Sequence, residues 1–97
     1  MMSELLLLQK WYARHCDGDW EHSYGMKIDT LDNPGWMLTV DLVDTGLSGS
    51  SLPRSRIDRS DIDWIQCEVS SDMYIACGGV FNLQEIIGQF LEFAGEE

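Results

Sequence analysis

The spacing of apolar residues changes twice along this chain of 97 residues, and these changes limit the folds it can adopt. Leu5, Leu8 and Tyr12 recur near helical spacing close to the N-terminus. From Tyr24 the period becomes two, which is typical of strands with one buried face. Helical spacing returns over residues 83–91 and predicts an amphipathic C-terminal helix.

Local signals predict where the two helices begin and end. Ser3 is a candidate N-cap for the first helix, which should end near residues 14–16 because residues 17–19 read Asp-Gly-Asp. Asn82 should begin the last helix, and Glu85 lies three residues later, as in a capping box.

Alternating patterns between these helices predict strands. They cover residues 24–31, 36–43, 62–70 and 73–77. A type II turn over Asn33–Trp36 should join the first two strands as a hairpin, because it has Pro and Gly at its central positions. Residues 44–60 read as a long loop with room for an edge strand. We therefore expect a single α+β domain over residues 1–97, with an antiparallel meander of about four strands and both helices on one face.

The charge is strongly acidic, with 17 acids against 6 bases and a net charge of −11. The arginines Arg54, Arg56 and Arg59 lie in one segment, and no Lys or Arg follows them. Nucleic acids and anionic membranes are disfavoured partners, because binding to them relies on Lys and Arg. A basic protein partner fits the charge better, with solubility alone as the other reading.

The sequence also bears on the compartment. No segment approaches the roughly 18–20 apolar residues of a membrane span. The Leu5–Leu8 run is flanked by Glu4 rather than by a basic region, so we do not expect a signal peptide. Three cysteines match neither a Cys-x-x-Cys site nor a secreted disulfide framework. A reducing cytoplasm is the expected location.

Residues 16–36 concentrate the groups that could carry chemistry: five carboxylates, two tryptophans, a histidine and a thiol. A metal site is one hypothesis, with Cys16, Asp17, Asp19 and His22 as the ligands. The run lacks a second ligand pair at a recognised spacing and the remaining oxygen ligands of a calcium loop. No cofactor is expected.

Catalysis by a thiol or by carboxylates is a second hypothesis. Cys16 would be the nucleophile, with His15 or His22 as its base. The expected helix C-terminus and nearby acids both disfavour a thiolate at Cys16. Paired carboxylates are a further option, either Asp19 with Glu21 or Asp61 with Asp63, but no substrate pocket is evident. Cys67 and Cys77 lie in strand patterns and read as small core residues.

Protein recognition is the third hypothesis, because tryptophan is enriched at interface hot spots. Trp36 is in phase with a buried strand face and should lie in the core. Trp64 fits either face of its strand, whereas Trp20 lies in the acidic loop and is the best candidate for partial exposure.

Several motifs of the chain recur together in a known family. They are Trp11-Tyr12, Cys16–His22, Tyr24-Gly25, Thr30–Trp36, Asp41-Leu42, Thr45, Asp63-Trp64, Cys67 and the closing helix over residues 83–93. On these motifs the chain resembles the immunity protein 53 family of bacterial polymorphic toxin systems. The resemblance implies a small cytoplasmic antitoxin, made beside a toxin gene, that binds the toxin so that the producing cell survives.

The resemblance and the acidic charge together favour a non-enzymatic protein that binds a cognate toxin, one candidate being a nuclease with a basic cleft. The residues expected to contact the toxin are Asp17, Asp19, Trp20, Glu21, His22, Asp32, Asn33 and Asp63. The alternatives are a small sulfurtransferase-like enzyme using Cys16 and His22, or a metal-binding module. The sequence leaves the oligomeric state open.

Overall fold

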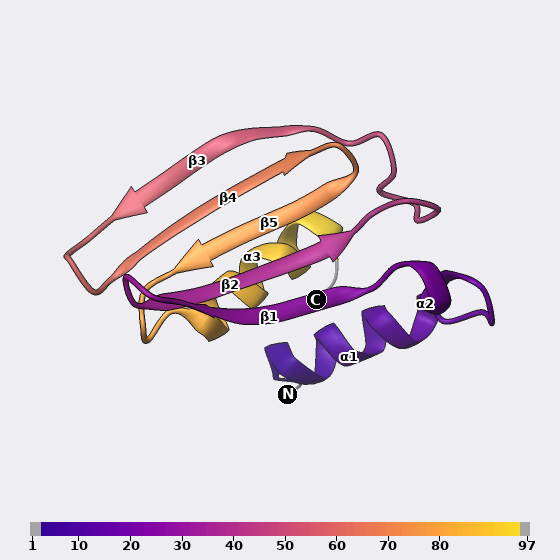
Figure 1. Ribbon diagram of the computed structural model, residues 1–97, viewed down its shortest axis with the longest axis horizontal. Helices are drawn as coiled ribbons and strands as arrows, with labels where there is room; N and C mark the ends of the chain where they lie inside the picture. Colours follow the sequence, from indigo (N-terminus) through magenta and orange to yellow (C-terminus); the bar gives the residue numbers. More distant parts are fainter. Residues whose placement is uncertain (1–2, 96–97) are drawn as a thin grey trace.

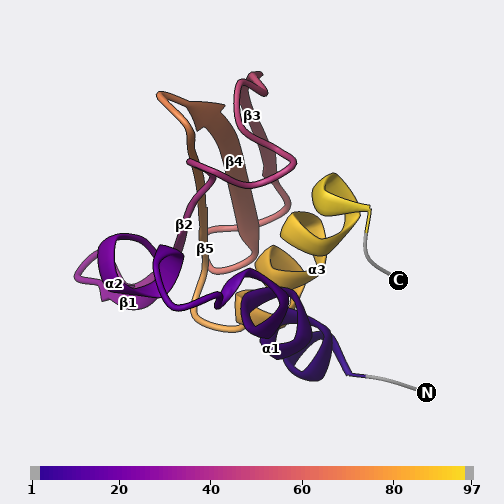
Figure 2. The same ribbon diagram turned by 90° about the vertical axis from the view of Figure 1, so that its right-hand side faces the viewer.

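A computed structural model describes residues 3–95 as a five-stranded antiparallel sheet with two long helices on one face (Figures 1 and 2). The elements are α1 (Glu4–His15), α2 (Trp20–Ser23), β1 (Met26–Leu31), β2 (Gly35–Asp41), β3 (Leu52–Asp58), β4 (Trp64–Ser70), β5 (Met73–Gly78) and α3 (Leu83–Ala94). The expected α+β class, with an N-terminal and a C-terminal helix, is confirmed.

The strand order is β1-β2-β5-β4-β3, with every neighbouring pair antiparallel. The fifth strand, β3, lies at the sheet edge, inside the segment that we expected to be a long loop. The sheet differs from a simple meander because the connection after β2 carries the chain to the opposite edge. Strands β2 to β5 thus form a Greek key, in which β3, β4 and β5 are joined in series and β5 returns beside β2.

Both long helices have the caps that their sequences favour, with one exception. The Leu6 backbone N–H donates to Ser3 Oγ at 3.2 Å, which confirms Ser3 as the N-cap of α1. Gly95 ends α3 in the left-handed conformation, with φ of 78°. Asn82 precedes α3 as expected, but its side chain makes no cap hydrogen bond and instead donates to the Glu85 carboxylate.

The core lies between the sheet and the two helices. Leu38, Ala76 and Cys67 share one register row, and all three are buried. Tyr74 of β5 meets Phe90 of α3 edge-on, with ring centroids 5.1 Å apart. Figure 2 shows that no helix among residues 3–95 covers the other face of the sheet.

The β1–β2 connection differs from the expected type II turn. That turn needs a positive φ at its third residue, but Gly35 has none; it is the first residue of β2, and the Asn33–Pro34 peptide is cis. Gly35 is required for a different reason. A Cβ there would lie 2.3 Å from the carbonyl oxygen of Gly78, so only glycine permits this approach of β2 to β5.

Candidate functional site

The acidic segment before α2 is a loop held by its own carboxylates. Asp17 Oδ1 accepts the backbone N–H groups of Trp20 at 3.0 Å and Asp19 at 2.9 Å, and these bonds hold the pKa of Asp17 below its ordinary value. Glu21 accepts the backbone N–H groups of Asp17 and Gly18, both at 2.9 Å. Its pKa is also lowered, first by its own backbone N–H and then by these two donors. Two of the expected contact residues therefore also fix the loop.

Trp20 is buried at 5% exposure, so the expectation that it is partly exposed is wrong. Its indole N–H donates to the carbonyl oxygen of Val43 at 2.8 Å. Its ring meets the rings of Trp11 and Tyr12 edge-on, each at a centroid distance of 6.1 Å. The short helix α2 places the Trp20 ring against α1. There the ring extends the core and positions the acidic loop.

The thiol and the histidines of this region make separate contacts. Exposed Cys16 donates from Sγ to the backbone oxygen of Tyr12 at 3.3 Å. The His15 ring lies tilted against the Trp11 ring, with the two centroids 4.0 Å apart, and its Nδ1 lies 2.7 Å from the Trp11 carbonyl oxygen. His22 is exposed at the end of α2. Within residues 3–95, no three or more His, Cys, Asp or Glu side chains are grouped to hold a metal ion. Neither the thiol enzyme nor the metal module gains support from this geometry.

The eight expected contact residues occupy two opposite ends of the sheet (Figure 1). Residues 17–22 lie at the end that carries α2. Asp32 and Asn33 lie in the β1–β2 connection, and Asp63 lies just before β4, at the other end. Asn33 lines one hollow together with Asp58, the last residue of β3, and residues 59–61 of the β3–β4 turn. The eight residues thus form two groups. The second group lies at the end of the sheet that carries the β3–β4 turn.

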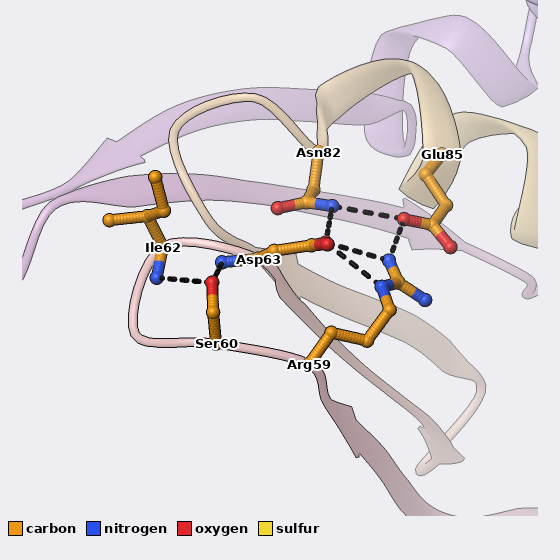
Figure 3. Close-up of polar contacts among 6 residues, drawn as sticks. All are labelled: Arg59, Ser60, Ile62, Asp63, Asn82 and Glu85. Atoms are coloured by element: carbon orange, nitrogen blue, oxygen red, sulfur yellow. Dashed lines mark hydrogen bonds and ion pairs between the residues drawn. The ribbon is translucent and has the colours of Figure 1, made fainter.

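A polar network ties the β3–β4 turn to the start of α3 (Figure 3). Arg59 binds the carboxylates of both Asp63, at 2.9 Å, and Glu85. Buried Asn82 donates from Nδ2 to the same two carboxylates, each at 2.9 Å. Arg59 and then Asn82 hold the pKa of Asp63 below its ordinary value. We call these four residues the Arg59 network.

Backbone contacts fix the β5–α3 loop at the same end. A Cβ on Gly79 would lie 2.2 Å from the carbonyl oxygen of Ile62, so the β3–β4 turn lies directly against the loop. The Gly79 N–H donates to the Trp64 carbonyl oxygen at 3.1 Å. The Trp36 indole N–H donates to the Val80 carbonyl oxygen at 3.0 Å. The loop is therefore held from β2, from β4 and from the turn.

This fixed end exposes a set of apolar side chains that sequence reasoning missed. Phe81 is 86% exposed, Ile62 is 60% exposed and Val80 is 36% exposed. We call them the Phe81 patch. Phe81 also lines a shallow groove along α3, together with the acids Glu4, Glu85 and Glu92. The only signal in the sequence was a Val-Phe pair outside every periodic segment.

The arginines of β3 lie on the sheet face that the helices leave uncovered, and each is paired with an acid. Arg56 binds Asp58 at 2.8 Å and covers the ring of Trp64, with its guanidinium carbon 4.4 Å from the ring centroid. Arg54 binds Glu68 at 3.1 Å. Trp64 is consequently buried on the open face, which settles the alternative that its strand pattern left open.

Comparisons with known proteins give one match. The family model described as immunity protein 53 matches residues 5–95. No curated protein and no solved structure matches the chain significantly. Within residues 3–95, no helix is long and apolar enough to cross a membrane.

Proposed function

Because the chain belongs to the immunity protein 53 family, we propose that it is the antitoxin of a bacterial polymorphic toxin system. It protects the producing cell, in the cytoplasm, by binding the cognate toxin. The observation that carries this proposal is the family match over residues 5–95, which spans every helix and strand except the first residue of α1.

The charge supports a basic surface on the toxin. The net charge of −11 is spread over both ends of the sheet, where Asp19 and Asp32 are exposed, and most of the arginines are already paired with acids. Charge of opposite sign raises the rate of encounter, and steered association reaches about 10⁸–10⁹ M⁻¹s⁻¹ at low salt. A basic nuclease cleft is one surface that such an antitoxin would cover.

We propose that protection involves binding and no chemical step. Cys16, the nucleophile of the enzymatic alternative, has its Sγ directed to a backbone oxygen of its own helix. The eight residues named from the sequence lie in two groups at opposite ends of the sheet, and each group marks one candidate contact surface. In the α2 group, Asp19 and His22 are exposed, while Asp17, Glu21 and buried Trp20 hold the loop in place.

The test uses the coding region next to that of this chain. Its C-terminal domain would be expressed in bacteria from an inducible promoter, alone or together with the chain, and survival would be counted. We expect killing without the chain and survival with it. An unrelated small protein of similar negative charge serves as the control and should not protect. If the chain leaves killing by the neighbouring toxin domain unchanged, the proposal is wrong.

A further inference from the structure

We propose that the toxin docks on the end of the sheet that carries the Phe81 patch, with Phe81 as its main anchor. This inference rests on the proposed function. The partner surface that fits is an apolar pocket surrounded by Lys and Arg side chains. The Phe81 patch and the acids beside it would occupy that pocket and its rim.

The exposure of Phe81 is the first argument. Scattered exposed apolar residues are normal on a protein surface. Here, however, three exposed apolar residues come from two backbone segments that adjoin: Ile62 from the β3–β4 turn, and Val80 and Phe81 from the β5–α3 loop. Aromatic rings contribute a large apolar area with few rotatable bonds, and a few buried anchors usually dominate binding.

The second argument is that the loop beneath the ring is already fixed. The Arg59 network joins the turn to α3, and the indole of Trp36 holds the carbonyl oxygen of Val80 (Figure 3 shows the network). Ordering a flexible loop on binding costs free energy, and a loop fixed beforehand avoids that cost. Phe81 follows directly after the residue whose carbonyl oxygen Trp36 holds, and its side chain is 86% exposed.

Charge is the third argument. Among the residues that the structure describes, the groove beside Phe81 is lined by Glu4, Glu85 and Glu92 and by no Lys or Arg. Arg59, the base of the network, binds two carboxylates at once. An apolar anchor with an acidic surround selects a partner whose pocket has a basic rim.

Within residues 3–95, no other surface exposes an aromatic side chain as fully as Phe81. At the α2 end the acids surround Trp20, but that ring is buried and bonded to the backbone. On the open face of the sheet, Arg56 covers the ring of Trp64. Among the aromatic residues within 3–95, Phe81 is the most exposed.

The experiment measures the equilibrium binding of the purified neighbouring toxin domain to wild-type chain and to three variants. We expect Phe81→Ala to raise Kd at least about 30-fold, the ratio that corresponds to a hot spot. Ile57→Ala is the matched apolar control, because Ile57 is 50% exposed on β3 and lies outside the groove. Asp19→Lys tests the α2 end. Both of these variants should change Kd less than about fivefold, the effect of a residue that is not a hot spot.

Each outcome decides between the two proposals. If wild-type chain binds and protects while Phe81→Ala binds equally well, the docking inference is wrong and the antitoxin proposal stands. A loss of binding in Asp19→Lys that exceeds the loss in Phe81→Ala would place the toxin at the α2 end and also overturn the inference. If wild-type chain neither binds nor protects, the proposed function itself fails.

Discussion

Replacement of Trp20 by alanine tests whether this residue belongs to the core, as the structure shows, or to a contact surface. The substitution removes a ring that is 95% buried, two edge-on aromatic contacts and the hydrogen bond to Val43. Truncation of a buried Trp to Ala costs about 3–5 kcal/mol. In a domain of this size each kcal/mol lowers Tm by roughly 4–8 °C, so we expect a fall of roughly 12–40 °C.

Phe81→Ala is the matched control, because it also removes an aromatic ring but one that is 86% exposed. Its free energy of unfolding should stay within about 0.5 kcal/mol of wild type. Urea unfolding followed by far-ultraviolet circular dichroism measures both variants and does not depend on the fluorescence of Trp20. If Trp20→Ala is as stable as Phe81→Ala, the burial of Trp20 and the role we assign to it are refuted.

Three further predictions follow from local geometry. Gly35→Ala should lower the free energy of unfolding by about 1–3 kcal/mol in a urea titration, because the new Cβ meets a backbone oxygen of the neighbouring strand. Gly25 has open space around it, so Gly25→Ala should change the free energy of unfolding by less than about 1 kcal/mol. The lowered pKa of Asp17 means that its stabilising effect is complete above the ordinary value of 3.8 and is lost as pH falls through the lower folded value. Asp17→Asn should therefore show a shallower loss of stability between pH 5 and pH 2 in acid titrations, and an unchanged slope would contradict the assignment. In the native protein, iodoacetamide should label exposed Cys16 and spare Cys67, because burial both shields the Cys67 thiol and raises its pKa. Mass spectrometry of peptides measures the labelling, and labelling of Cys67 before Cys16 would contradict the prediction.

The two long helices and the central strands could be predicted from the sequence because their burial follows a simple period. The apolar residues of α3 recur at helical spacing, and β2 alternates between a buried and a half-buried face. β3 was harder to recognise because it is an edge strand with six of its seven residues exposed, so burial leaves no alternation in its sequence.

Trp20 shows why burial in a short element escapes sequence reasoning. The helix α2 has four residues, too few to display a period, and acids surround the ring in sequence. Its burial depends on α1 and on a backbone oxygen 23 residues away. The burial of Trp64 likewise depends on Arg56, which comes from a neighbouring strand.

The candidate site could be predicted only in part. The acidic character and the carboxylates themselves could be read from the sequence. The division of these carboxylates between two ends of the sheet depends on the strand order. The Arg59 network joins residues up to 26 positions apart, and no local pattern announces such a contact. Phe81 escaped notice because an exposed aromatic residue in a loop has no periodic neighbours.

The central claim is that protection results from binding alone, and a titration of toxin activity tests it most directly. A fixed amount of the purified toxin domain would be mixed with increasing amounts of the chain, and residual toxin activity would be measured after short and long incubations. We predict that activity falls in proportion to added chain, disappears near equimolar ratio and does not depend on incubation time. Progressive inactivation of excess toxin by a small fraction of an equivalent would show turnover and would contradict the claim.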